Sequence, residues 1–226
     1  YVTVATGADA VDFGDLLQAM GQNAACDDKS RGLALPASGP SGYVDTIQYI
    51  TIATPGNATD FGNGTAAIAY VAGTSDNSRG VWGGGYQRTP DLPGVKYIDY
   101  VAIQTPGNAS DFGDLSFGAL APMAVSDNAT RACFAGGYTT SHTSGINTIE
   151  YITIGSTGNA TEFGDLTRLG LRGTGVNNAS RGVFCGGTPA PTNTMDYITI
   201  GSTGNATDFG DTIPAQRDSP AGSSGG

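Results

Sequence analysis

One phrase recurs along this chain and constrains the fold more than any other feature. It reads TGNATDFGD at 203–211, with close copies at 54–63, 105–114 and 156–165 and a worn copy, GADAVDFGD, at 7–15. Three markers keep step with the phrase. They are Phe13, Phe61, Phe112, Phe163 and Phe209; Tyr1, Tyr49, Tyr100, Tyr151 and Tyr197; and Arg31, Arg79, Arg131 and Arg181. A period near 50 residues is too long for one coil of a β-solenoid and suits a four-stranded propeller blade.

Each repeat divides into four short segments of strand character. In the last full repeat they are LTRLGLRGTGV at 166–176, RGVFCGG at 181–187, TMDYITI at 194–200 and ATDFGD at 206–211. β-Branched and aromatic residues alternate in the third segment, and Gly, Asn and Ser separate the segments. The chain has 36 Gly but only two Glu and two Lys, so strong charged helix formers are nearly absent. We therefore expect an all-β fold.

The repeats form one predicted domain over 1–226, with repeats at about 1–48, 49–99, 100–150, 151–196 and, in part, 197–226. Residues 1–16 read as the third and fourth strands of a blade, and 212–226 read as a first strand. We expect five blades, the closing one shared by the two termini. A chain that continues beyond these residues, with more blades, is the alternative.

Most repeated residues have a structural interpretation. The Phe is expected to fill the contact between neighbouring blades, the Gly-Asn pair to form a turn with positive φ, and the flanking Asp to accept backbone N–H bonds. Three of the arginines, Arg79, Arg131 and Arg181, are expected opposite acids of the adjacent strand, which are Asp99, Glu150 and Asp196. Calcium binding at Asp60 or Asp208 is the weaker reading, because D-F-G-D does not have the alternating spacing that wraps a cation. A ring of Arg that binds anions is a further alternative.

The search for catalytic chemistry finds little. We predict no catalytic residue, metal site or cofactor. The only histidine is His142, and Cys26, Cys133 and Cys185 form no CxxC pair and read as buried or half-buried free thiols. The net charge of −10 argues against nucleic-acid binding, and no apolar run of about 18 residues is available for membrane insertion. Abundant Asp leaves a glycan hydrolase or lyase as a minor alternative.

The loops after the second segments vary most between repeats and project from one side of the predicted disc. A rigid ring that presents short loops rich in Tyr, Ser, Thr and Asn suits recognition of a protein or glycan. The candidate binding residues on these loops are Tyr43, Tyr86, Arg88, Tyr138 and His142.

The segment order resembles the kelch repeat. Its marks are the glycines that close the second segments at 83–85, 136–137 and 186–187, the third-segment Tyr, and the fourth-segment Phe in place of the usual Trp. The first repeat departs from it, because RGLALPASG has no glycine pair. The phrase with its flanks is also similar to repeats in tail-fibre and other virion proteins of marine bacteriophages, especially those of cyanobacteria.

That second resemblance implies an extracellular, non-enzymatic structural or adhesive part of a virus particle. Its partners would be other virion proteins, a host-surface glycan or receptor, or further copies of the chain. A cellular kelch-like scaffold that binds a partner protein through the same loops is the alternative from another class.

Overall fold

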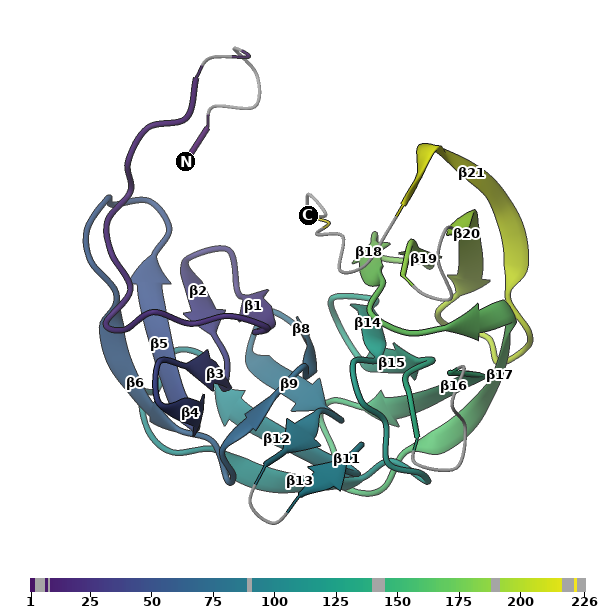
Figure 1. The fold of residues 1–226 in the computed structure, drawn as a ribbon, viewed down its shortest axis with the longest axis horizontal. Helices are drawn as coiled ribbons and strands as arrows, with labels where there is room; N and C mark the ends of the chain where they lie inside the picture. Colours follow the sequence, from purple (N-terminus) through teal and green to yellow (C-terminus); the bar gives the residue numbers. More distant parts are fainter. Residues whose placement is uncertain are drawn as a thin grey trace.

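A computed structural model describes residues 1–2, 7, 9–88, 91–139, 145–187, 192–216 and 222 of the chain. In these ranges every regular element is a β-strand and no helix is found, so the predicted all-β class is confirmed. Four antiparallel sheets of four strands stand side by side around a ring as propeller blades, and the ring is open on one side (Figure 1). No described segment is a helix long and apolar enough to cross a bilayer.

The four blades follow one another in chain order. Blade 1 comprises β1 (Ala25–Asp27), β2 (Arg31–Ala34), β5 (Thr46–Thr51) and β6 (Thr59–Asn63). Blade 2 comprises β8 (Ala72–Ser75), β9 (Arg79–Gly83), β12 (Tyr97–Ala102) and β13 (Ser110–Asp114). Blade 3 comprises β14 (Met123–Ser126), β15 (Arg131–Ala135), β16 (Ile146–Thr153) and β17 (Thr161–Gly170). Blade 4 comprises β18 (Thr174–Asn177), β19 (Arg181–Cys185), β20 (Thr192–Thr199) and β21 (Thr207–Gln216).

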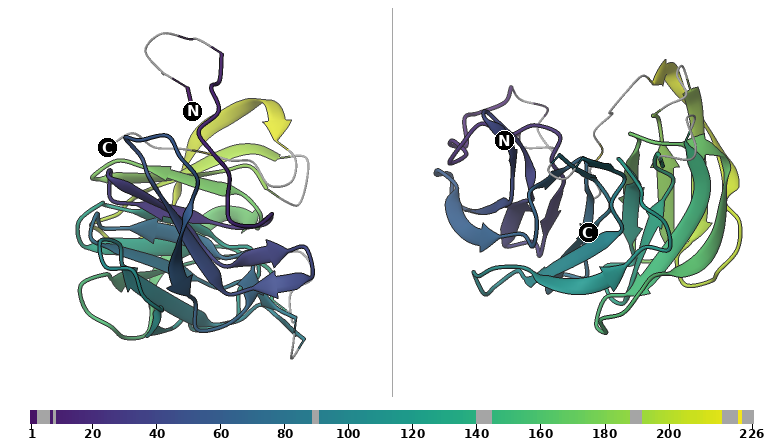
Figure 2. Two further views of the ribbon diagram at one scale, coloured as in Figure 1. Left: turned by 90° about the vertical axis from the view of Figure 1, so that its left-hand side faces the viewer. Right: turned by 60° about the horizontal axis from the view of Figure 1, so that its bottom comes forward.

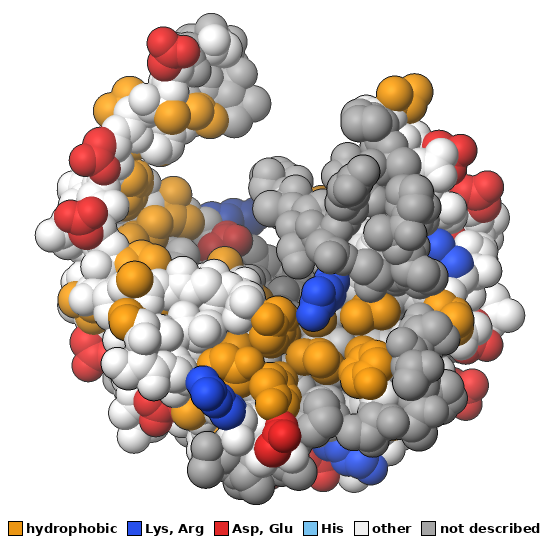
Figure 3. All heavy atoms as spheres, viewed as in Figure 1, with side chains coloured by type: hydrophobic (Ala, Val, Ile, Leu, Met, Phe, Trp, Pro, Cys, Tyr) orange, Lys and Arg blue, Asp and Glu red, His pale blue; other side chains and the backbone are white. Residues whose placement is uncertain are grey.

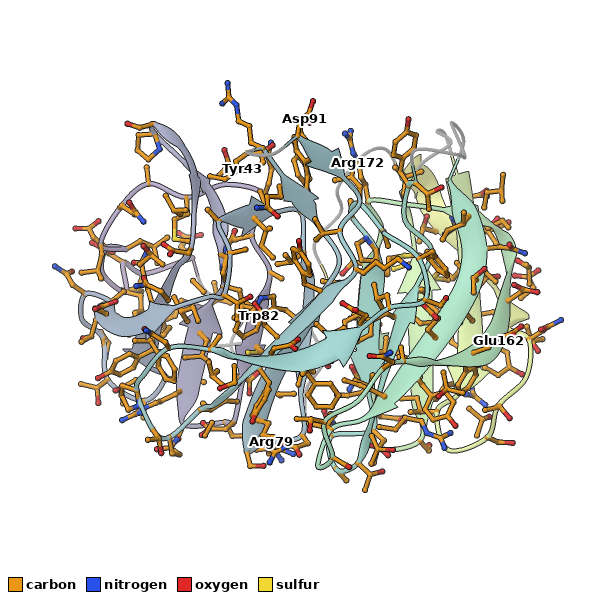
Figure 4. All side chains as sticks on the ribbon, turned by 90° about the horizontal axis from the view of Figure 1, so that it is seen from below. Tyr43, Arg79, Trp82, Asp91, Glu162 and Arg172 are labelled. Atoms are coloured by element: carbon orange, nitrogen blue, oxygen red, sulfur yellow. The ribbon has the colours of Figure 1, made fainter. Side chains whose placement is uncertain are left out.

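Five smaller strands lie on one face of the ring. They are the hairpin β3 (Ala37–Gly39) and β4 (Gly42–Val44), and the three-stranded sheet of β7 (Ile68–Ala69), β10 (Tyr86–Gln87) and β11 (Leu92–Pro93). We call this side the loop face; it carries Tyr43, Asp91 and Arg172, whereas Arg79 lies on the opposite face (Figure 4). Figure 2 shows the same ring from two further sides.

The hydrophobic core lies between successive blades as three clusters, one for each blade pair. In each cluster the third residue of a second strand is found together with an Ile that follows the third strand of the next blade. These pairs are Leu33 with Ile103, Val81 with Ile154, and Cys133 with Ile200, and all six residues are fully buried. The only Trp, Trp82, is also fully buried and lies between the two faces of the ring (Figure 4).

The repeated phrase joins the outer strands of neighbouring blades, which confirms the predicted place of the Phe. At the joint of blades 2 and 3 the N–H of Gly158 donates to the Phe112 carbonyl (2.7 Å) and the N–H of Ala160 to the Asp114 carbonyl (2.8 Å). The N–H of Asp114 donates to the Asn159 side chain (3.0 Å). We call this set of contacts the rim joint. All three bonds recur between blades 3 and 4 and between residues 13–15 and blade 1, and the bonds of Asn63 with Ala109 and Asn108 recur between blades 1 and 2.

The positive φ predicted for the Gly-Asn pair is found in part. Gly158 and Gly204 have φ of 155° and 153°, whereas Gly56 and Gly107 do not have positive φ. Asn159 accepts a bond from the preceding blade, and the glycine after the Phe has positive φ in every copy of the phrase. Gly113 has φ of 144°, and a Cβ added there would lie 2.5 Å from the carbonyl of Gly158. Glycine is therefore required twice over, by its own backbone and by the approach of the next blade. The predicted Asp role holds, since Asp111 accepts from the N–H of Gly113 (3.1 Å).

The predicted cross-strand pairing of Arg with acid is wrong. The register places Arg79 opposite Ala102, and Asp99 opposite Trp82. Arg79 instead stacks on the ring of Tyr100, 5.0 Å from its centroid, and donates to the carbonyl of Ile154 in the next blade (2.9 Å). The same pair of contacts is made by Arg31 and by Arg131, each with the Tyr of its own blade and the Ile of the next. The Arg thus joins blades.

The acids bond to residues that follow the repeated phrase. Asp99 is buried and accepts from the N–H (3.2 Å) and the hydroxyl (2.7 Å) of Thr65 in blade 1. Glu150 accepts from the N–H of Ser116, and Asp196 from Thr167, in the same way. Each of these bonds crosses from one blade to the next, so the polar core joins the blades as the apolar core does.

The two ends of the ring are less complete than its joints. The equivalent Phe of blades 1, 2 and 3 is buried, but Phe209 at the free edge of blade 4 is 49% exposed. At the other end, Tyr1 and Val11 exchange two backbone bonds, and the ring of Tyr1 meets that of Phe13 edge to face, as Tyr and Phe do in every blade. Among the described residues the structure has four blades, and residues 9–16 form no strand.

Candidate functional site

An aromatic cluster on the loop face is the most developed site of the described chain. Tyr43 comes from β4 and Tyr86 from β10, and their rings meet edge to face with centroids 5.4 Å apart. The hairpin and the small sheet bring them together across two repeats, whose loops differ in sequence. Edge-to-face contact holds each ring in place and leaves both half-exposed.

Charged groups surround the two tyrosines. The Tyr86 hydroxyl donates to the carboxylate of Asp91 (2.5 Å), and this bond raises the pKa of Tyr86. Burial raises the pKa of Tyr43, the neighbouring Tyr70 raises it further, and the positive charge of Arg88 opposes the shift. Both phenols are therefore neutral hydroxyl groups at physiological pH. One face thus combines two fixed aromatic rings with a cation and an anion.

A row of four residues with left-handed backbone, which we call the left-handed row, adjoins the cluster through Tyr70, a neighbour of Tyr43. Gln22, Tyr70, Ala121 and Arg172 all have φ between 53° and 60°. The N–H of Tyr70 donates to Gln22 (2.9 Å), that of Ala121 to Tyr70 (3.1 Å), and that of Arg172 to Ala121 (2.9 Å), each time to the carbonyl. The guanidinium of Arg172 also lies over the ring of Tyr70, 5.7 Å from its centroid.

Sequence reasoning missed the left-handed row because its side chains do not repeat. The only available signal was spacing, since the four residues stand at the same intervals as the repeated Phe of the blades. A left-handed backbone at a residue other than Gly is uncommon and costs free energy. The backbone bonds of the left-handed row therefore hold Tyr70 and Arg172 at fixed points of the loop face.

The structure places the predicted binding residues as follows. Tyr43 and Tyr86 are in direct contact, and Arg88 is close enough to act on both phenols. Tyr138 belongs to the same side of blade 3, where its backbone pairs with Leu120, and its carbonyl would lie 3.1 Å from a Cβ added at Gly94. His142 lies outside the described residues. Hydrophobic side chains gather on this face, with basic and acidic groups among them (Figure 3).

A second, more acidic cleft lies at the outer edge, between blades 1 and 2. It has a volume of about 420 Å³, and its lining includes Thr65, Tyr97, Asp99, Asp111 and Asp114. Burial raises the pKa of Asp99, although the two bonds from Thr65 oppose the shift. Because those bonds and the β-ladder already engage Asp99, its carboxylate serves the contact between blades.

Metal and thiol chemistry have little support in the described chain. No group of three or more His, Cys, Asp or Glu side chains is placed to hold a metal ion in the parts that the structure describes. The three cysteines are free thiols, Cys26 and Cys133 buried and Cys185 half-buried, as predicted. Burial raises the pKa of Cys133 to about 12 and raises that of Cys26 further. Neither is a nucleophile at neutral pH.

Comparison with known proteins leaves the family open, because no protein-family profile matches the chain and no curated protein is significantly similar to it.

Proposed function

We propose that this chain is a non-enzymatic recognition domain of a virus particle, which binds a host-surface glycan through its loop face. The observation that carries the proposal is the cluster of Tyr43 and Tyr86 with Asp91 and Arg88. Tyr rings supply contact area to the apolar faces of sugars at low entropic cost, because few torsions need to be fixed. The bond to Asp91 and the edge-to-face contact restrict Tyr86 before any ligand arrives, which is preorganisation.

The particle role is supported by the resemblance of the repeats to those of bacteriophage virion proteins. A repeated scaffold joined by backbone bonds needs no cofactor and presents a rigid surface for docking to other virion subunits or to further copies of the chain. The net charge of −10 suits salty surroundings, where ions screen repulsion between like charges. We also propose that the blades are kelch-like, because their segments follow the order of the kelch repeat.

The proposal includes a fifth blade shared by the termini. Residues 8–10 match the Gly-Asn-Ala of the phrase as Ala-Asp-Ala, and Phe209, Gly210 and Asp211 are the matching half of a further rim joint. An Asp can accept the bond that Asn accepts in the other joints. The C-terminal tail also keeps the period, because a Cβ on Gly222 would touch Val176 of β18 as a Cβ on Gly175 would touch Val125 of β14.

Gly210→Ala tests this closure directly. In the described structure a Cβ at Gly210 meets nothing within 4 Å, whereas one at Gly113 meets the next blade; both residues have positive φ, 126° and 144°. A closed ring predicts that Gly210→Ala lowers the unfolding free energy about as much as Gly113→Ala does. If only the smaller cost of backbone strain is seen, the ring is open and the fifth blade is refuted.

Binding to a bacterial surface-glycan array, with whole marine cyanobacterial cells alongside, tests the function. We expect saturable binding that Tyr43→Ala or Tyr86→Ala reduces at least about tenfold. Tyr97→Ala is the matched control, because Tyr97 is an exposed tyrosine of the outer cleft. Glycan binding that all three substitutions leave intact would show that the loop face is not the binding surface. Binding to a protein partner through this face, with no glycan bound, would favour the cellular scaffold.

A further inference from the structure

Two arginines of the loop face do not belong to the repeated scaffold. Arg172 stands in the left-handed row, whose other three members, Gln22, Tyr70 and Ala121, are uncharged. Arg88 is exposed and follows β10, in a loop whose sequence differs from repeat to repeat. By contrast, the arginines that recur once in each blade lie over the Tyr of the same blade, at 4.3–5.0 Å from the ring centroid. The repeated contacts between blades therefore do not account for the charge of Arg88 or Arg172.

Arg172 is held beside the tyrosine cluster. Its guanidinium lies over the ring of Tyr70, 5.7 Å from the centroid, and its backbone N–H donates to the carbonyl of Ala121 (2.9 Å). Tyr70 in turn is close enough to Tyr43 to raise the pKa of its phenol. Figure 4 shows Arg172, Tyr43 and Asp91 on the same face of the ring. The guanidinium is thus fixed next to the rings on which a bound sugar would pack.

The charges around the two tyrosines of the cluster do not cancel. Arg88 and Asp91 both act on the phenols of Tyr43 and Tyr86 and shift their pKa values in opposite directions, so these two charges offset each other. Arg172 adds a second cation. Within this group of residues positive charge is in excess, although the whole chain carries a net charge of −10. An acidic ligand is therefore attracted to this group more than to the rest of the surface.

We propose that the glycan bound at the loop face is acidic and that Arg172 binds the carboxylate of one of its sugars. The sugar ring packs on Tyr43 or Tyr86, and the carboxylate accepts hydrogen bonds from the guanidinium. A carboxylate is planar and matches the fork of N–H donors that an Arg presents. Such charge-assisted bonds are roughly twice as strong as bonds between neutral groups. The inference rests on the proposed function, since it names the class of glycan that the loop face binds.

Pairs of glycans that differ only in their carboxylates test the proposal. Bacterial capsular polysaccharides that contain uronic acids are compared with the same polymers after their carboxyl groups have been reduced to alcohols. Binding of the full chain to each immobilised polymer is measured by biolayer interferometry. We expect saturable binding to the acidic polymers, which reduction weakens about tenfold or more. Dextran sulfate, which carries negative charge without carboxylates, should bind more weakly than the uronic-acid polymers.

Arg172→Gln removes the cation and suits the backbone. Gln22 occupies the equivalent place in the left-handed row, and both residues have φ of 57°. The variant should bind the acidic polymers about tenfold more weakly or worse, and it should bind the reduced polymers as the wild type does. Lys29→Gln is the matched control, because Lys29 is also a cation with left-handed backbone, at φ of 73°. It precedes Arg31, the counterpart of Arg79, which lies on the face opposite the loop face (Figure 4).

Three results would overturn the inference and leave the proposed function standing. They are equal binding of native and reduced polymers, equal effects of Arg172→Gln and Lys29→Gln at equal melting temperatures, and binding of dextran sulfate as tight as that of the uronic-acid polymers. Tyr43→Ala reports on the proposed function itself, because it should weaken binding to the native and the reduced form of each polymer alike. A chain that binds no glycan of either form would refute the proposed function and the inference together.

Discussion

Gly113→Ala is the sharpest test of how the blades are held together. The glycine has φ of 144°, and the added Cβ would lie 2.5 Å from the backbone of Gly158. Real Cβ atoms do not approach a carbonyl so closely, so either strand β13 or the next blade must move. Backbone strain at such a φ costs about 1–3 kcal/mol.

The movement also disrupts the rim joint. Three hydrogen bonds cross this joint, donated by Gly158, Asp114 and Ala160. Each contributes about 0.5–1.5 kcal/mol. We therefore expect Gly113→Ala to lower the unfolding free energy by about 3–6 kcal/mol, allowing for partial retention of the bonds. For a chain of this size, at about 2–4 °C per kcal/mol, that is a fall of roughly 6–24 °C in melting temperature.

Gly107→Ala is the matched control. A Cβ there meets nothing within 4 Å and the backbone does not require positive φ, so the change should be neutral or slightly stabilising. Urea denaturation followed by far-UV circular dichroism measures both variants, with the slope of the transition as a check on cooperativity. Equal stability of the two variants would refute the conclusion that the rim joint holds neighbouring blades together.

Three further predictions concern single side chains. Arg79→Lys should lower the unfolding free energy by about 1–2 kcal/mol, because Lys has neither the planar stack nor the directed bond. The control, Arg88→Lys, should change it by less than about 0.5 kcal/mol. Equal effects of the two substitutions in denaturation would contradict the role of Arg79 in joining the blades. Burial raises the pKa of Asp99 above its unfolded value, so the stability that its protonated carboxyl contributes at low pH is lost as pH rises through the folded pKa. The Asp99→Asn variant should therefore gain stability relative to the wild type as pH rises above about 4. A difference in melting temperature that stays constant with pH would contradict this. In thiol labelling followed by mass spectrometry, the half-buried Cys185 should react before Cys133, and simultaneous reaction of the native protein would contradict the burial.

The period of the sequence was enough to predict the blades because each marker residue serves the same contact every time it occurs. Phe112 fills the space between blades 2 and 3, and the four segments of each repeat became the four strands of a sheet. The segment boundaries followed from Gly, Asn and Ser at the turns. Such local signals are reliable where one structural unit is copied and each copy faces a similar neighbour.

The partners of the repeated residues could not be predicted from spacing. Arg79 and Asp99 were expected to pair because they come from adjacent strands, but one points to the third blade and the other to the first. Charge complementarity in a sequence identifies possible pairs only within a strand register, and the register is set by backbone bonds that the sequence does not display. Contacts between repeats are therefore harder to infer than contacts within them.

The same distinction separates the scaffold from the proposed recognition surface. At the joints both backbone and side chains repeat, as the rim bonds of Asn159 and its counterparts show. In the left-handed row the backbone bonds repeat but the side chains do not. Tyr70 and Arg172 stand at positions where Gly would be less strained. Because the side chains at these equivalent backbone positions differ despite the strain, this part of the surface is not the same in any two repeats. Those positions lie on the loop face beside Tyr43, where the loops of successive repeats also differ, and this is why we locate recognition on that face.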